Sequence, residues 1–230
     1  MEARVLADAE LAAREAARVI AAEARAAVEA RGRFVLAVSG GRSPWRMLRA
    51  LAAEEVPWAA VHVVQVDERV APAGDPERNL THVRESLLGR APLPEGHLHA
   101  MPVEQVDLDS AARLYARTLG QIAGSPPVLD LAHLGLGADG HTASLVPGDA
   151  VLHVADRDVA VTALYGERRR MTLTYPALDR SRRILWLVTG ADKAAVLSRL
   201  LAGDRSIPAA RVRRDSGLVL ADRAAAGEKE

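Results

Sequence analysis

The chain has 230 residues, with 30 basic and 30 acidic side chains, a formal net charge of zero and no cysteine. This balance leaves no overall field to attract a nucleic acid or an anionic membrane, so we expect a small molecule as the partner. The absence of cysteine excludes disulfides, thiolate catalysis and cysteine metal sites, and it agrees with a reducing compartment.

The N-terminal residues carry acids and run directly into an alanine-rich helical pattern, so they lack the apolar core of a secretory signal. That pattern predicts a helix from about residue 4 to residue 31, with Gly32 as its stop. No apolar run approaches the roughly 20 residues needed to span a bilayer. We therefore expect a cytoplasmic protein that makes no contact with a membrane.

The rest of the chain alternates between strand and helix patterns. The predicted strands are 34–38, 61–66, 129–134, 171–175, 184–188 and 218–220, and the clearest helices are 44–53, 79–88, 110–122 and 191–201. This order predicts an α/β fold with a largely parallel sheet covered by helices on both faces. No Pro/Gly/Ser-rich linker divides the chain, so we expect one domain over 1–230, with a frayed tail at about 224–230.

The first predicted strand ends in a segment with the composition of an anion site at a helix start. It reads Ser39, Gly40, Gly41, Arg42, Ser43 and Pro44. Ser43 can cap the helix, Pro44 suits the first helical position, and the two glycines expose backbone N–H groups. We expect a phosphate to bind here; an ordinary capped turn is the alternative.

The second predicted strand ends in three consecutive charged residues, Asp67, Glu68 and Arg69. A charge run of this kind is often a solvated loop. The carboxyl ends of strands in an open α/β sheet are, however, the edge at which ligands bind. Its position therefore favours a functional role for this triplet.

A glycine-rich turn over 135–148 follows the third predicted strand and holds Asp139 two residues before His141. Its glycines also match the dinucleotide fingerprint, which requires a long helix directly behind it. Here Pro147 and Gly148 interrupt the chain within about two turns, and Asp139 would point negative charge at a pyrophosphate. The turn thus predicts an active site, and we expect no cofactor.

Five motifs in the same order give the chain its resemblance to a known family. They are Ser39-Gly40-Gly41 with Ser43-Pro44, Asp67-Glu68-Arg69, Gly135 to Gly148, Arg170-Met171-Thr172-Leu173-Thr174 and Thr189-Gly190-Ala191-Asp192-Lys193-Ala194. In this pattern, which covers about 33–222, the chain resembles the 6-phosphogluconolactonases. The visible departure is Val146, where that family usually has phenylalanine.

The resemblance implies a Rossmann-like open sheet and hydrolysis of 6-phospho-D-glucono-1,5-lactone in the oxidative pentose phosphate pathway. His141 is the best candidate for a general base, because an imidazole titrates near neutrality. Asp139 could orient that imidazole or a bound water, and Arg69 could stabilise developing negative charge. The roles of Asp67 and Asp139 stay open, and either is an alternative base.

Arg170 and Lys193 match the family positions that hold the phosphate. Arg170 is one of three consecutive arginines with Arg168 and Arg169, so a solvated run is possible and the residue that faces the phosphate stays open. Lys193 lies early in a predicted helix, where a cation is unfavourable unless an anion is present. That position favours a role in ligand binding.

Two other functions compete with hydrolysis. A glucosamine-6-phosphate deaminase has a glutamate seven residues after the aspartate, where this chain has Val146. A sugar-phosphate sensor normally carries a fused DNA-binding segment, for which this chain shows no pattern. His97 and His99 have no further ligand at metal spacing, so we expect no metal, and Ser144 lies in no nucleophile elbow. We expect a monomer or a homodimer.

Overall fold

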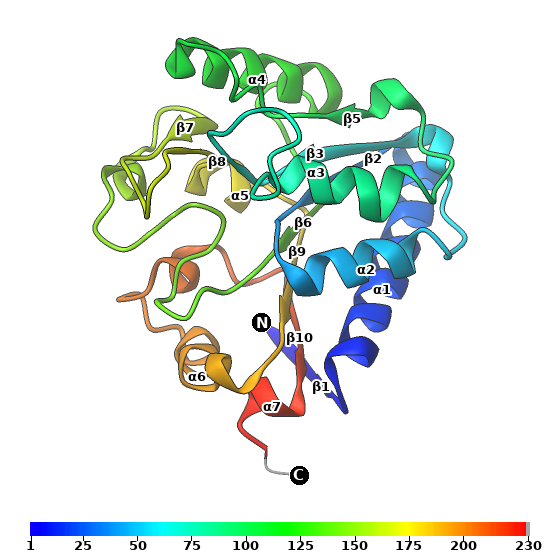
Figure 1. The fold of residues 1–230 in the computed structure, drawn as a ribbon. Helices are drawn as coiled ribbons and strands as arrows, with labels where there is room; N and C mark the ends of the chain where they lie inside the picture. Colours follow the sequence, from blue (N-terminus) through cyan, green and yellow to red (C-terminus); the bar gives the residue numbers. More distant parts are fainter. Residues whose placement is uncertain (229–230) are drawn as a thin grey trace.

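The computed structural model describes residues 1–228, and its centre is a sheet of seven parallel strands (Figure 1). In spatial order the strands are β1 (Glu2–Leu6), β10 (Gly217–Asp222), β9 (Arg183–Val188), β6 (Leu131–Leu134), β2 (Phe34–Val38), β3 (Val61–Gln65) and β5 (Leu98–His99). The expectation of an α/β fold with a largely parallel sheet is confirmed. Parallel pairing makes all seven strands end at the same edge of the sheet.

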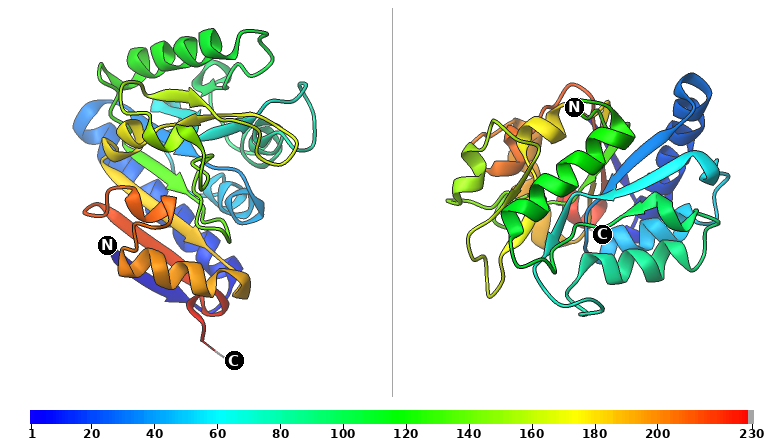
Figure 2. Two further views of the ribbon diagram at one scale, coloured as in Figure 1. Left: turned by 90° about the vertical axis from the view of Figure 1, so that its left-hand side faces the viewer. Right: turned by 90° about the horizontal axis from the view of Figure 1, so that it is seen from above.

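Helices cover both faces of this sheet, as Figures 1 and 2 show for α1 and α2 on one side and α6 on the other. The α-helices are α1 (Ala9–Arg31), α2 (Arg42–Leu51), α3 (Asn79–Val83), α4 (Leu108–Ala123), α5 (Tyr175–Asp179), α6 (Ala194–Ala202) and α7 (Arg223–Ala226). A π-helical turn, Arg84–Leu88, continues α3, and short 3-10 turns are Trp58–Ala60, Glu95–His97, Ala150–His153, Ala191–Lys193 and Pro208–Arg211.

The strand side chains alternate between two apolar cores. In β2, Phe34, Leu36 and Val38 pack with α1 and α2 in one core, whereas Val35 and Ala37 belong to the core on the α4 and α6 side. This alternation is the period of two that a strand imposes. Because both faces are covered, the central strands read as continuous apolar runs.

A second, three-stranded antiparallel sheet lies outside the main one, in the order β4 (Asp67–Arg69), β8 (Arg170–Leu173) and β7 (Val159–Val161). Two expectations change here. The strand predicted at 171–175 does not join the parallel sheet, and the charged triplet is itself a strand, with Arg69 opposite Arg170. Both segments are too short for their pattern to show the pairing partner.

The expected helix over 4–31 is wrong in its first residues. Residues 2–6 form β1, which pairs with β10, and the helix begins at Ala9. Asp8 caps it by accepting a hydrogen bond from Leu11 N at 2.7 Å. The alanine-rich pattern gives no sign of the boundary between β1 and α1, because pairing with the distant strand β10 outweighs the local preference for a helix. Gly32 ends the helix as predicted, with φ 72°.

The expected frayed tail is wrong for its first half. Arg223–Ala226 form α7, which Asp222 caps, and Ala225 is fully buried. Residues 229–230 lie outside the described part of the chain. No helix among residues 1–228 is both long enough and apolar enough to cross a bilayer.

His133 in β6 is a fully buried histidine beneath the loop that follows β2. Its Nδ1 accepts a hydrogen bond from Ser39 N at 3.4 Å, and its carbonyl accepts one from Ser39 Oγ at 2.9 Å. Burial lowers the pKa of His133 to about 3 from an ordinary value of 6.5. The ring is therefore neutral in the folded protein.

We predict that His133 makes the protein acid-sensitive. Between pH 6.5 and about 3 the unfolded chain binds a proton at this residue that the folded chain does not. The free energy of unfolding should then fall by about 1.4 kcal/mol for each pH unit below 6.5 on account of this group. Urea unfolding at pH 7, 6, 5 and 4 measures it. His133→Gln should flatten the slope, and the exposed His153→Gln should not; equal slopes in all three proteins would contradict the prediction.

Candidate active site

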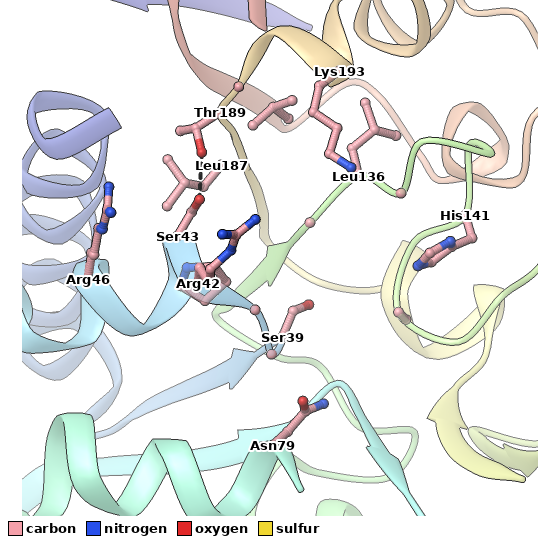
Figure 3. A pocket seen from close by; sticks show the side chains of 18 of the residues that line it. Ser39, Arg42, Ser43, Arg46, Asn79, Leu136, His141, Leu187, Thr189 and Lys193 are labelled. Carbon is pink, nitrogen blue, oxygen red and sulfur yellow. Dashed lines mark hydrogen bonds between the residues drawn. The ribbon is translucent and has the colours of Figure 1, made fainter. Parts of the chain in front are cut away.

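A cavity of about 510 Å³ opens at the carboxyl edge of the parallel sheet. The segments after β2, β3, β6 and β9 line it, together with Asn79 from α3 and Arg170 from β8. Figure 3 shows Arg42 and Ser43 on one side of it, His141 on the other, and Lys193 between them at the top of the view. All eleven residues expected at the site except Asp139 line the cavity, and Asp139 contacts His141.

The loop between β2 and α2 is held close to α3. A Cβ on Gly40 would lie 1.8 Å from Asn79 Oδ1, so only glycine permits this approach. Gly41 has φ 120° and is the residue that precedes the helix, so the expectation that Ser43 caps α2 is wrong. Ser43 lies inside the helix, and its Oγ is 2.5 Å from Thr189 Oγ1. The first backbone N–H groups of α2 still face the cavity edge without intrahelical partners.

Asp139 and His141 form a hydrogen-bonded pair in the turn after β6. His141 Nδ1 lies 2.5 Å from Asp139 Oδ1, which also accepts from the His141 backbone N–H at 3.1 Å. A Cβ on Gly137 would lie 2.1 Å from His141 Nδ1, so the turn leaves no room for a side chain there. With Nδ1 engaged, Nε2 is the ring nitrogen left to act in the cavity.

The charge of Asp139 is favoured by its neighbours. Partial burial opposes ionisation, but the hydrogen bonds and charge of His141 and the hydroxyl of Tyr165 outweigh it and lower the pKa of Asp139. An ionised carboxylate that holds an imidazole in one orientation is the arrangement that general-base catalysis by histidine uses. The geometry therefore suits His141 better than Asp139 as the base.

Asp67 has a different environment. It is 6% exposed, accepts a hydrogen bond from Ser144 Oγ at 2.6 Å and lies 3.3 Å from Asn79 Nδ2. Burial raises the pKa of Asp67, with Ser144, Arg170 and Arg69 acting in the opposite direction. The Ser144 hydroxyl is thus engaged as a hydrogen-bond donor to this carboxylate, which agrees with the absence of a nucleophile elbow.

The three charged residues that follow β3 lie in three different environments. Glu68 is fully buried and accepts hydrogen bonds from four N–H donors, which belong to Asn79, Leu80, Arg69 and the side chain of Gln65. It thereby caps the start of α3 from outside the helix. Arg69 in turn donates to Glu77 O at 2.7 Å and Asn79 Oδ1 at 3.0 Å.

The structure separates the three consecutive arginines. Arg168 pairs with Asp75 at 3.2 Å and with Glu77, whereas the exposed Arg169 donates to Thr162 O at 3.3 Å. Arg170 lines the cavity, and within residues 1–228 its buried Nε makes no hydrogen bond. Burial lowers the pKa of Arg170, a cost that Asp67 partly offsets. Arg170 is the arginine of the three that can meet a ligand.

Lys193 lies directly before α6, in the turn that follows β9. Its Nζ is 3.1 Å from Asp192 Oδ2, and the carboxylate of Asp222 accepts from Gly190 N at 3.0 Å. Gly190 has φ 99°, a conformation that glycine adopts without strain. Asp222 therefore holds the turn that carries Lys193 into the cavity.

Several residues of the site were not expected from sequence. Asn79, Arg46 and Asp222 line the cavity, and Tyr165 contacts Asp139. Asn79 at the start of a predicted helix carried a weak signal, because asparagine is common at helix starts. Tyr165 carried none, since it lies in a loop with no motif. Val146 is buried, 3% exposed, and is not part of the cavity wall.

The histidines around β3 and β5 group together in a way not expected from sequence. His62 Nδ1 lies 3.1 Å from His99 Nε2, and the rings of His62 and His97 are 4.2 Å apart. Burial and these neighbours lower the pKa of His62 to about 4. Over residues 1–228, no three His, Cys, Asp or Glu side chains converge as a metal site.

Comparison with known proteins places the chain in a family. Residues 7–221 match the family described as glucosamine-6-phosphate isomerases/6-phosphogluconolactonase. The chain belongs to this family. A 6-phosphogluconolactonase of Mycobacterium bovis is 39% identical over 217 residues, 88% of each chain. The crystal structure of a 6-phosphogluconolactonase from Thermotoga maritima has a TM-score of 0.84 and 28% identity over 96% of this chain and 98% of that one.

The fold does not separate the two activities that the family name contains. A monomeric glucosamine-6-phosphate deaminase has a TM-score of 0.86 over 100% of both chains, at 20% identity, which shows a shared fold. The sequence similarity points to the lactonases, because relatives of that name are 33–39% identical over most of this chain. The chemistry of the site has to decide between the two substrates.

Proposed function

We propose that this chain hydrolyses 6-phospho-D-glucono-1,5-lactone to 6-phospho-D-gluconate, the second step of the oxidative pentose phosphate pathway. The chain is a carboxylic ester hydrolase. The observation that carries the proposal is the His141 imidazole held by Asp139 at 2.5 Å on the wall of a cavity that also contains Arg69, Arg170 and Lys193. A base beside clustered cations suits an anionic ester substrate.

The reaction begins with a water molecule between His141 Nε2 and the lactone carbonyl carbon. The imidazole takes one proton as the water oxygen bonds to that carbon, and the carbonyl oxygen becomes negative. Arg69, which Glu77 O and Asn79 hold, stabilises this oxyanion. The bond from the carbon to the ring oxygen then breaks, and the imidazolium returns the proton to that oxygen. The product is at first a carboxylic acid with a free hydroxyl, and the acid loses the second proton of the water to the solvent to give the carboxylate.

The phosphate of the substrate binds to the start of α2 and to two cations. The Gly40–Ser43 segment at the start of α2 supplies backbone N–H groups, and Arg170 and Lys193 supply charge from β8 and from the turn before α6. The unpartnered Nε of Arg170, within the described residues, supports this role.

Absence of cysteine from the chain supports the cytoplasm as the compartment of the reaction.

We predict catalysis of lactone hydrolysis without deamination. The purified protein should consume 6-phosphogluconolactone well above the spontaneous rate. It should release no ammonia from glucosamine 6-phosphate, because the position of the deaminase's glutamate holds Val146, which is apolar and buried outside the cavity wall. Parallel assays of proton release and ammonia measure both activities. A lactone rate equal to the spontaneous one, or substantial ammonia release, would reject the proposal.

Replacing His141 should remove the base but leave the binding site. His141→Asn is expected to lower kcat about a hundred- to ten-thousandfold, because asparagine keeps a hydrogen bond without basicity. Binding of 6-phosphogluconate should stay near the native value by calorimetry. A variant that retained most of the native kcat would move the base to Asp139 or Asp67.

Substitutions at two glycines test the position of the His141 ring without changing the histidine itself. Gly137→Ala puts a Cβ 2.1 Å from His141 Nδ1, whereas a Cβ at Gly120, in α4 and outside the cavity, has no atom within 4 Å. Gly137→Ala should therefore lower kcat as the ring is displaced, and Gly120→Ala should stay close to native. Equal activity of the two variants would show that the position of the ring does not matter.

Removal of either phosphate cation should weaken binding more than turnover. Charge-assisted hydrogen bonds are worth about 1.5 to 3 kcal/mol, so Arg170→Ala or Lys193→Ala should raise KM about ten- to a hundredfold where binding equilibrates. Arg169→Ala is the matched control, because that arginine is exposed and bonds to Thr162 O. An unchanged KM in both variants, with equal hydrolysis of unphosphorylated gluconolactone by the native protein, would refute the phosphate site.

A further inference from the structure

Tyr165 lies in the loop between β7 and β8 and contacts three members of the site. Its hydroxyl donates a hydrogen bond to Asp139 Oδ2 at 3.1 Å. Its ring meets the His141 ring edge-on, with centroids 5.7 Å apart and an interplanar angle of 66°. The Arg170 Cζ atom lies 4.8 Å from the centroid of the same ring. One side chain thus touches the acid and the base of the pair and a cation of the phosphate site.

The hydroxyl of Tyr165 completes the hydrogen bonding of the Asp139 carboxylate. Oδ1 accepts from the backbone and the ring of His141, and Oδ2 accepts from Tyr165. A carboxylate held at one oxygen can rotate about its Cβ–Cγ bond, whereas one held at both oxygens cannot do so without breaking a hydrogen bond. Tyr165 therefore determines the direction from which Asp139 meets the imidazole.

The loop that carries Tyr165 is itself anchored to the site. Tyr165 N donates to Arg168 O at 3.1 Å, and Arg168 pairs with Asp75 and Glu77. The carbonyl of Glu77 accepts from Arg69. Partial burial and Asp139 raise the pKa of Tyr165, so its hydroxyl keeps the proton that it donates.

We propose that Tyr165 is a positioning residue that locks the Asp139 carboxylate against His141 with its hydroxyl and supports Arg170 with its ring. The inference rests on the proposed lactone hydrolysis. It assigns separate effects to the two parts of the side chain. The hydroxyl acts on turnover through Asp139, and the ring acts on substrate binding through a cation–π contact.

The test compares Tyr165→Phe with Tyr165→Leu. Tyr165→Phe should lower kcat about three- to tenfold with little change in KM, because one hydrogen bond to Asp139 is lost and the ring remains. Tyr165→Leu should show the same loss in kcat and also raise KM about three- to tenfold, because Arg170 loses its aromatic partner. Calorimetry with 6-phosphogluconate should show weaker binding to the leucine variant alone.

Two further variants separate positioning from a general effect on the fold. Tyr175→Phe removes a hydroxyl that donates to Pro208 O at 2.9 Å away from the pair, and it should leave kcat unchanged. Asp139→Ala, which removes the acceptor of the Tyr165 hydroxyl, is combined with Tyr165→Phe in a double-mutant cycle. The tyrosine substitution should have no further effect once Asp139 is replaced, because it acts through that carboxylate. A native kcat in Tyr165→Phe, or fully additive losses in the cycle, would overturn the proposal.

A measurement without turnover distinguishes failure of this inference from failure of the proposed function. The proton between Asp139 and His141 Nδ1 should give a downfield NMR resonance in the native protein and in Tyr175→Phe, and this resonance should broaden or shift in Tyr165→Phe. An unchanged resonance rejects the positioning role whether or not the lactone is hydrolysed. A native protein without lactonase activity that shows the expected NMR change rejects the function and keeps the role of Tyr165.

Discussion

Parallel pairing of the central strands is the constraint on which the site depends. β2, β3, β6 and β9 are paired in one direction, so the segments that follow them meet at a single edge of the sheet. Residues as far apart in the chain as Ser39 and Asp222 come together there. The helices on both faces bury the strands, so two apolar cores pack against the same sheet.

Close approach at this edge requires residues without side chains at particular positions. Gly40 lets the β2 loop lie against Asn79, and Gly137 leaves space for His141. A Cβ added at either glycine would lie closer than 3 Å to that neighbouring side chain. The glycine-rich composition of these turns therefore reflects packing between loops as much as contact with a ligand.

The small antiparallel sheet adds the electrostatic part of the site. β4 and β8 place Arg69 opposite Arg170, two cations whose proximity the buried Asp67 partly compensates. Glu68, buried beneath them, fixes the start of α3 and with it Asn79. The parallel sheet thus places His141 and the Gly40–Gly41 turn at the cavity, and the second sheet adds the charges of Arg69 and Arg170.

The sequence by itself determined the alternation of strands and helices, the loops at the strand ends and most of the residues at the site. These features depend on local patterns, namely apolar periodicity, glycine in turns and charged residues after strands. Each such pattern is visible within a single segment of the chain. The ordered motifs also identified Asp139, His141 and Lys193 as members of one group.

Only the tertiary structure decided what depends on partners far away in the chain. Residues 2–6 form a strand because they pair with β10 at the edge of the main sheet. Residues 170–173 do not join that sheet, because they pair with β4 and β7 instead. Arg170 faces the cavity and Arg168 does not, because Arg170 begins β8 whereas Arg168 lies before that strand and pairs with the acids Asp75 and Glu77. Tyr165 has no local signal at all. Its role comes from a hydrogen bond to a carboxylate 26 residues earlier, a contact that exists once the sheet has brought the two loops together.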